Sequence, residues 1–215
     1  IVASFGIYTS VDNSSKEVLN SIEKNKISWL SNTVWPFLLV ASAGSLCQAS
    51  LLQSIGFYIY DIFSYLDRLP VIVSMTFALL AISTIVSQYI FTDFYPLNTT
   101  KLLLCGVFLI ILSFFIMAFF NKILIYYISI VINGLGGGML RPGISSALSL
   151  SQNPSNQGSA AGYLGSVYPI GHMLTPFVAM PIYALNPAYL YYFSSILCIV
   201  LIIFIIVHPI FKNKY

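Results

Sequence analysis

Long apolar segments are the feature that most constrains this chain. Six of them occur in the sequence, and each is close to the roughly 20 helical residues that cross a hydrocarbon layer about 30 Å thick. They cover residues 34–62, 71–91, 102–120, 123–150, 158–185 and 188–207. In lipid every backbone polar group needs an internal partner, so segments of this kind fold as helices. The sequence therefore predicts an all-α polytopic membrane protein with six transmembrane helices.

The composition excludes a water-soluble domain. Of the 215 residues 58% are hydrophobic and 7% are charged, whereas about a quarter of a soluble domain is charged. The cysteines Cys47, Cys105 and Cys198 lie inside apolar segments, which predicts small hydrophobic side chains rather than disulfides or zinc ligands. The net charge of +3 is dispersed, unlike the basic patch of a nucleic-acid binder. We expect the lipid bilayer as a partner, and no nucleic acid, metal or cofactor.

The polar segments divide the chain into four regions. Residues 1–8 are apolar but too short to cross a bilayer, and we interpret them as the tail of a truncated preceding helix. Residues 9–33 are polar and predict a central linker. Residues 34–211 form the predicted six-helix bundle, and residues 212–215 form a short polar tail.

The distribution of basic residues predicts an orientation. With six spans, the linker and the carboxyl terminus lie on one side together with Lys16, Lys24, Lys26, Lys101, Lys212 and Lys214. The other side receives Arg68 and Lys122. Because Lys and Arg near span ends favour the cytoplasm, we expect the linker and the carboxyl terminus to be cytoplasmic.

The six segments differ in polarity. Segments 102–120 and 188–207 are almost purely aliphatic and aromatic, and we expect them to face lipid. Segments 34–62 and 71–91 carry several Ser, Thr and Gln residues, and nine of the thirteen glycines lie between Gly134 and Gly171. Small residues permit close helix packing. The pattern predicts four inner helices and two outer ones.

Several motifs carry a family resemblance. They are Asn-Gly-Leu-Gly-Gly-Gly-Met-Leu-Arg-Pro-Gly at 133–143, Gln-Gly-Ser-Ala-Ala-Gly at 157–162, Gly-His-Met-Leu-Thr-Pro at 171–176 and Gly-Phe-Tyr-Ile-Tyr-Asp at 56–61. In their order along the chain, these motifs resemble the carboxyl-terminal six helices of major facilitator superfamily transporters, in particular bacterial drug:proton antiporters of the tetracycline-efflux type. The resemblance implies half of a twelve-helix fold, a missing amino-terminal half as partner, and a place in the bacterial inner membrane.

Two side chains inside the spans stand out chemically. Arg141 is a charged residue well inside segment 123–150, where a charge is costly unless it faces a cavity or a partner. It contacts an anionic substrate group or a carboxylate of the missing half, or it is a structural arginine that reaches the membrane surface. His172, near the middle of segment 158–185, carries an imidazole, the type of side chain suited to proton transfer near neutral pH. It carries a coupling proton or donates a hydrogen bond between helices.

Further polar side chains complete the candidate substrate site: Gln48, Gln53, Gln88, Asn133 and Tyr168. Hydrogen bonding between helices explains the four amides equally well. We predict a second set for helix packing and bending: Gly134, Gly138, Pro142, Gly143, Gly158, Gly162 and Pro176. The acidic residues lie outside the span interiors, so a membrane carboxylate would have to come from the missing half, unless His172 substitutes for it.

These features favour one function over three others. The leading hypothesis is secondary active transport of a small molecule by alternating access, with protons as the coupling ion and efflux of drugs or metabolites. The first alternative is an uptake carrier for an anionic or zwitterionic metabolite, and the second is a polytopic membrane protein that does not transport. An enzyme is disfavoured, because the short loops offer no catalytic cluster.

Overall fold

The computed structural model describes residues 28–94 and 98–211, without the side chains of residues 92–94. Six long helices account for most of these residues, and the described ranges contain no strand. The helices are α2 (Trp35–Ile62), α3 (Leu69–Gln88), α4 (Thr99–Phe119), α5 (Ile123–Leu150), α6 (Gln157–Leu185) and α7 (Pro187–Val207). Short helical turns follow at Tyr89–Phe94, Pro154–Asn156 and Pro209–Phe211. The predicted all-α class is confirmed.

The helices match the six apolar segments closely. α5 has the predicted bounds, and no other helix end differs by more than three residues. The predicted tail at 1–8, the predicted tail at 212–215 and residues 9–27 of the predicted linker lie outside the described residues. The membrane thickness fixes the length of each apolar segment, and the helices therefore begin and end where the hydropathy changes.

Five described helices are long and apolar enough to cross a membrane: α2, α3 with its extension to Phe91, α4, α5 and α7. α6 is as long as the longest of these, at 29 residues, but it does not reach their mean hydropathy. Three prolines, Pro169, Pro176 and Pro181, lie inside it, together with several glycines and serines. We treat α6 as the sixth span because it packs along α2 and α7 over the same bundle.

Local sequence sets several helix starts. Pro36, Pro70 and Pro187 occupy the first turns of α2, α3 and α7, where the missing N–H has no helical partner to lose. The Asn186 side chain caps α7 by accepting a hydrogen bond from the Ala188 backbone N–H at 2.9 Å. Short connections join the consecutive helices, which therefore run antiparallel to one another.

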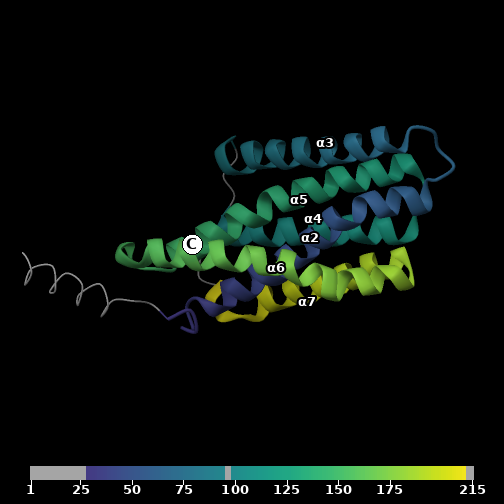
Figure 1. Cartoon of the computed structure of the whole chain (residues 1–215). Coiled ribbons are helices and arrows are strands. Elements are labelled where there is room, and N and C mark those ends of the chain that lie inside the picture. The colour runs from purple at the N-terminus through teal and green to yellow at the C-terminus, as the bar shows by residue number, and fades with distance from the viewer. Residues whose placement is uncertain (1–27, 95–97, 212–215) are drawn as a thin grey trace, which may run out of the picture.

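α5 lies in the middle of a closely packed group with α3 and α4 (Figure 1). A Cβ added at Gly134 would overlap the Ser83 side chain of α3. At Gly138 it would lie 2.5 Å from the Thr84 carbonyl oxygen, also of α3, and at Gly136 it would lie 2.7 Å from the Gly106 carbonyl oxygen of α4. Only glycine permits these backbones to approach so closely.

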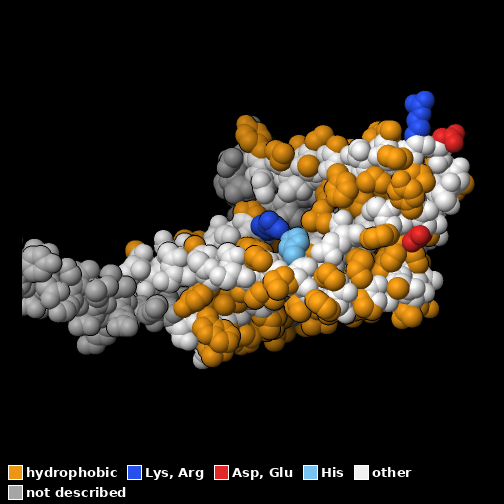
Figure 2. Space-filling view, in the orientation of Figure 1, with side chains coloured by type: hydrophobic (Ala, Val, Ile, Leu, Met, Phe, Trp, Pro, Cys, Tyr) orange, Lys and Arg blue, Asp and Glu red, His pale blue; other side chains and the backbone are white. Residues whose placement is uncertain are grey.

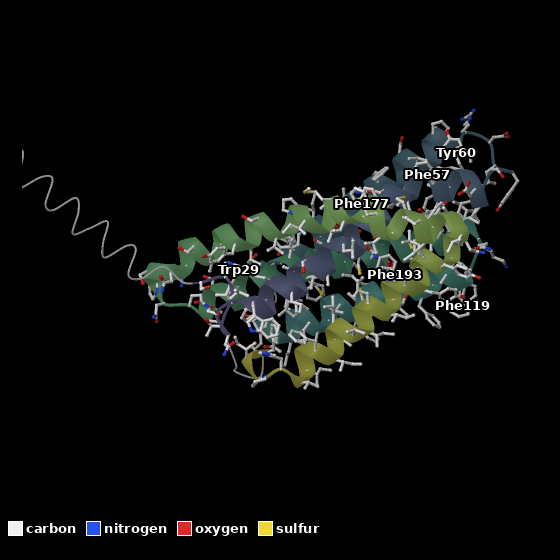
Figure 3. The ribbon with its side chains drawn as sticks, turned by 60° about the horizontal axis from the view of Figure 1, so that its bottom comes forward. Trp29, Phe57, Tyr60, Phe119, Phe177 and Phe193 are labelled. Atoms are coloured by element: carbon white, nitrogen blue, oxygen red, sulfur yellow. The ribbon has the colours of Figure 1, made fainter. Side chains whose placement is uncertain are left out.

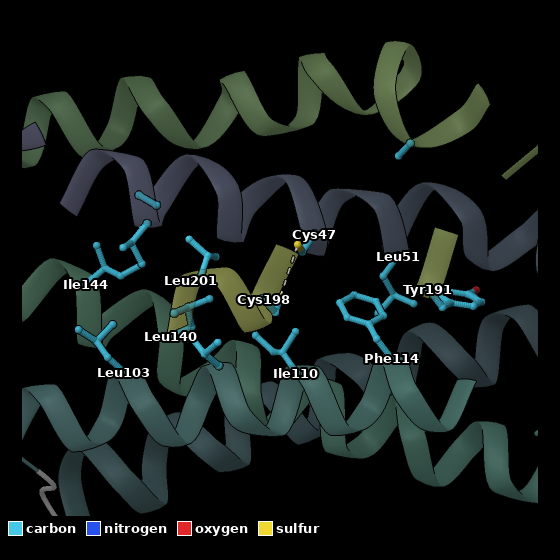
Figure 4. Packing of buried hydrophobic residues seen from close by; sticks show 14 of the residues in the cluster. Cys47, Leu51, Leu103, Ile110, Phe114, Leu140, Ile144, Tyr191, Cys198 and Leu201 are labelled. Carbon is cyan, nitrogen blue, oxygen red and sulfur yellow. Dashed lines mark hydrogen bonds between the residues drawn. The ribbon is translucent and has the colours of Figure 1, made fainter. Parts of the chain in front are cut away.

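A second pair, α2 and α6, crosses at Gly171. A Cβ added there would overlap Ser45 of α2. α7 contacts α2, α4 and α6 and so links the two groups. Cys198 of α7 donates a hydrogen bond to Cys47 Sγ of α2 at 3.5 Å (Figure 4), and the described cysteines form no disulfide. Direct contacts of α5 with α2 and α6 are few by comparison.

Exposed apolar side chains lie on α3 and α6 as well as on α4 and α7, the two helices that we expect to face lipid. α4 exposes Phe108, Phe115 and Phe119, and α7 exposes Val200 and Ile203. The opposite stripe of each helix is buried against the bundle. α3 was expected among the inner helices, and it is the least buried described span. It packs mainly on α5 and leaves its other side open in the described structure.

Aromatic side chains mark both ends of the bundle. Trp29 and Tyr60, each more than half exposed, lie towards opposite ends in Figure 3. Near the end with Tyr60, the rings of Tyr58 and Tyr126 stack at 5.2 Å, and Tyr191 meets Tyr58 edge-on at 5.1 Å. Amphipathic rings are typical of membrane–water boundaries. Exposed aromatic side chains at both ends agree with a bundle that crosses the membrane.

The α3–α5 contact yields a first prediction. Gly134→Ala should lower the thermal unfolding midpoint, because the new Cβ overlaps Ser83 and overpacking costs about 1–3 kcal/mol. The expected decrease is roughly 3–10 °C, measured on the purified protein in detergent.

Gly56→Ala is the matched control, since a Cβ at Gly56 of α2 meets nothing within 4 Å. It should keep or raise the midpoint, because alanine favours helix over glycine by about 1 kcal/mol. Equal midpoints for the two variants would contradict the glycine-dependent contact.

Candidate functional site

A cavity of about 420 Å³ lies between α2, α3, α5 and α6. Its apolar wall comes mainly from α3 and α5, with Phe77, Leu80, Ile85, Leu140 and Ile144. Its polar lining consists of Ser45, Gln48, Thr84, Gln88, Asn133, Arg141 and Tyr168. A mostly apolar cavity with a few convergent polar groups is typical of a small-molecule site.

The cavity occupies one half of the bundle length. α3 contributes only Phe77 and later residues, so the described lining includes no residue near the end of the bundle where α2 connects to α3. Figure 2 shows a basic side chain and a histidine side chain in the hollow between α3 and α6, midway along this face. In the same view, acidic side chains appear towards the end with the α2–α3 turn. The cavity therefore lies in the part of the bundle away from that turn.

Five of the seven predicted substrate-site residues line this cavity: Gln48, Gln88, Asn133, Arg141 and Tyr168. The other two, Gln53 and His172, lie outside its lining. Gln53 Nε2 donates a hydrogen bond to the His172 carbonyl oxygen at 3.3 Å, which joins α2 to α6. Gln53 thus takes the alternative role, a contact between helices. Binding by the other residues stays a prediction.

Arg141 is held by an aromatic ring rather than by a carboxylate. Its guanidinium carbon lies 5.2 Å from the centre of the Tyr168 ring, a cation–π contact. The described acidic side chains, Asp61 and Asp67, lie at and after the far end of α2, where Asp61 accepts a hydrogen bond from the Tyr183 hydroxyl at 2.5 Å. No carboxylate among the described side chains therefore neutralises Arg141.

Two amide side chains in the lining lack protein partners. Asn133 is fully buried, and neither its Nδ2 nor its Oδ1 has a hydrogen bond within the described structure. Gln48 Nε2 is buried and also lacks a partner there, and it lies against Gly137, where an added Cβ would be 2.8 Å away. A buried polar group left unpaired costs about 1–3 kcal/mol. A ligand or water in the cavity can supply the partner.

The predicted packing residues have different surroundings. Gly134, Gly138 and Gly143 lie at helix contacts, the last against Leu103 of α4. A Cβ at Gly158 or Gly162 meets nothing within 4 Å of the described structure. Pro142 and Pro176 lie inside α5 and α6, which stay helical through them. Their packing or bending roles stay predictions.

Sequence reasoning did not single out five glycines at close contacts: Gly44, Gly106, Gly136, Gly137 and Gly171. Gly106 is the clearest case, because it is the only glycine within the long apolar sequence of α4. A small residue isolated among Leu, Phe and Ile could have indicated the point where another helix approaches.

The comparisons with known proteins agree with this architecture. A family model, the Major Facilitator Superfamily, matches residues 72–214. The chain therefore belongs to the major facilitator superfamily, a class of membrane transporters rather than enzymes, and is an integral membrane protein.

Solved structures extend the match to the fold. A peptide transporter, POT, in complex with sulfate aligns with a TM-score of 0.72 at 16% identity, over 83% of this chain and 38% of that chain. A mutant of POT in complex with alafosfalin aligns with a TM-score of 0.69 at 17% identity, over 79% of this chain and 36% of that chain. This chain thus spans little more than a third of the length of these structures. The likeness shows the fold alone, and no curated protein matched.

The cavity yields a second prediction. In a Cys105→Ser background, Thr84→Cys places a thiol on the cavity wall. A membrane-impermeant methanethiosulfonate should label it from the side where α3 ends, and much more slowly from the opposite side, because the cavity lies in that half of the bundle. Labelling rates are measured on membrane vesicles of both orientations.

Ser129→Cys is the control, since Ser129 is fully buried in α5 and its hydroxyl, like that of Thr84, bonds within its own helix. It should stay unlabelled from both sides. Equal labelling of Thr84→Cys from the two sides, or rapid labelling of the control, would contradict the position of the cavity.

Proposed function

We propose that this chain forms one half of a secondary active transporter that exports a small organic molecule in exchange for protons. The proposal rests on the cavity of about 420 Å³ between α2, α3, α5 and α6. Within the described residues, the cavity contains an arginine without a counter-charge and buried amide groups without hydrogen-bond partners, inside helices whose other faces are apolar. Membership of the major facilitator superfamily supports the same class of function.

Alternating access requires a second wall for this cavity. We infer that the amino-terminal half of the protein supplies it, and that the substrate binds between the two halves near the membrane midplane. The largely exposed sides of α3 and α6, which flank the cavity, support this arrangement. The protein would lie in the bacterial inner membrane, with the linker and the carboxyl terminus in the cytoplasm, as the distribution of Lys and Arg favours.

His172 is our candidate for the coupling proton. It lies one helical turn after Tyr168 and therefore on the same face of α6. Imidazole titrates near neutral pH, and the described acidic side chains lie at the far end of the bundle. Its backbone carbonyl bonds to Gln53, which links any movement of this turn to α2.

A second candidate function is uptake of an anionic or zwitterionic metabolite. The absence of a described carboxylate beside Arg141 favours it, since an unneutralised arginine selects negative groups. The two candidates differ in direction rather than in the site, so one flux experiment separates them.

The test is flux into proteoliposomes that contain the full-length protein, with a panel of fluorescent lipophilic compounds. An acid interior should drive accumulation in vesicles with the cytoplasmic face outward, and a protonophore should abolish it. Accumulation driven by a proton gradient of the opposite sense would establish uptake instead. No gradient-dependent flux across the panel would overturn secondary active transport.

The proton site yields a third prediction. His172→Gln should lower gradient-driven flux about tenfold or more, because glutamine cannot carry the proton. Substrate counterflow without a proton gradient should persist, since the cavity itself is intact. Both rates are measured in the same proteoliposomes.

His208→Gln is the control, because His208 follows α7 and packs against Trp35 and Phe204, away from the cavity. It should leave both rates near the wild-type values. Unchanged gradient-driven flux in His172→Gln would refute the role of His172, and a parallel loss of counterflow would indicate binding or folding instead.

A further inference from the structure

We propose that the cavity selects an amphipathic organic monoanion whose negative group pairs with Arg141. A hydrogen-bonding group, such as an amide or a hydroxyl, then contacts Gln48 and Asn133 one to two helical turns away. This inference rests on the proposed function and names the chemical class of its substrate.

The anionic end follows from Arg141. The guanidinium carbon lies over the Tyr168 ring, 5.2 Å from the ring centre. A planar guanidinium binds carboxylate, sulfonate or phosphate through two parallel hydrogen bonds. Among the described residues, Arg141 is the only charged side chain in the lining. This part of the site therefore matches one negative charge.

The second polar group follows from the spacing along α5. Asn133, Gly137 and Arg141 succeed one another at intervals of four residues and lie on one face of the helix. At 1.5 Å per residue the intervals are about 6 Å each. Gln48 of α2 reaches over Gly137, so its amide lies between Asn133 and Arg141. Measured along the helix axis, the backbone positions of Gly137, next to the Gln48 amide, and of Asn133 thus lie about 6 and 12 Å from that of Arg141.

Both amides offer donors, and Asn133 Oδ1 also offers an acceptor. An amide, sulfonamide or hydroxyl group on the ligand satisfies both kinds of atom. A plain hydrocarbon at this position would leave them unpaired, at a cost of about 1–3 kcal/mol for each group. The site thus discriminates against purely apolar anions as well as against neutral molecules.

The apolar body follows from the part of the wall that α3 contributes. Phe77, Leu80 and Ile85 of α3 line the cavity, beside the polar stripe of the neighbouring helix α5. Transfer of apolar surface from water to such a wall is favourable, at about 25 cal/mol per Å². The ligand is therefore amphipathic along its length, with a polar edge towards α5 and an apolar edge towards α3.

The test uses a matched pair of probes, 6-(dansylamino)hexanoate and its methyl ester. Both carry the same aromatic body and sulfonamide, and they differ in the charge. Fluorescence titration of the full-length protein in lipid nanodiscs, corrected with empty nanodiscs, gives the two dissociation constants. The acid should bind about tenfold or more tightly than the ester, as expected for a charge-assisted contact.

Variants assign the preference to its residues. Arg141→Gln should reduce the acid-to-ester ratio to about one, while the binding of the ester, which reports folding, stays within about threefold of wild type. Arg141→Lys should retain part of the preference, because lysine keeps the positive charge but lacks the planar guanidinium that forms two parallel hydrogen bonds. Asn133→Leu should weaken both probes by a similar factor and leave the ratio unchanged.

Lys122→Gln is the control for charge, since Lys122 precedes α5 at the end far from the cavity. It should leave the ratio unchanged. A ratio near one in the wild-type protein overturns the proposal, and so does a ratio that survives Arg141→Gln. If Lys122→Gln removes the preference as fully as Arg141→Gln, surface charge explains it, and the proposal is likewise overturned.

The outcomes separate this inference from the proposed function. Proton-driven flux of the neutral ester without a preference for the acid would reject the anionic class and keep the transporter. Selective acid binding without flux of either probe would keep the binding site and reject transport.

Discussion

The close approach of α5 to α3 and α4 is the contact on which the rest of this structure depends. In lipid no hydrophobic effect drives helices together, so association relies on van der Waals packing at small residues. Gly134 and Gly138 bring α5 against α3, and Gly136 brings it against α4. With these faces occupied, the face with Asn133, Gly137 and Arg141 is the one that lines the cavity. The glycines therefore position the polar side chains without contacting a ligand themselves.

The cavity lies between two packed groups rather than inside one. α3, α4 and α5 form the first group, and α2 and α6 form the second, with their crossing at Gly171. The second group has its own polar links: Gln53 to the His172 carbonyl near the middle, and Tyr183 to Asp61 at the end. α7 connects the groups through buried contacts such as Cys198 with Cys47. Because direct packing of α2 and α6 on α5 is sparse, the width of the cavity can change without breaking the close glycine contacts.

Much of this arrangement could be predicted from the sequence, because lipid penalises polar groups strongly. The limits of α5 and the positions of Arg141 and Asn133 follow from hydropathy and from the cost of polar residues in a span. The crossing at Gly171 and the contact of Gln53 with the His172 carbonyl could not be predicted. They depend on the rotation of α6 about its axis relative to α2, and periodicity does not encode this rotation where several faces of a helix are apolar. The open surroundings of Gly158 and Gly162 depend on the same rotation.

Within the described span interiors, the positive charge of Arg141 has no negative counterpart. Arg141 and the titratable His172 lie along the middle of the bundle, whereas Asp61 and Asp67 lie at and beyond the end of α2. A cation in a low-dielectric region is costly to move or to enclose without a counter-charge. An anion bound to Arg141 would lower that cost, so closure of the cavity would be easier with the site loaded than with the site empty. A coupled carrier needs such a difference between the barriers for closure of the loaded cavity and of the empty cavity. The higher barrier slows the conformational change of the empty protein, so that the change takes place mainly with a ligand bound.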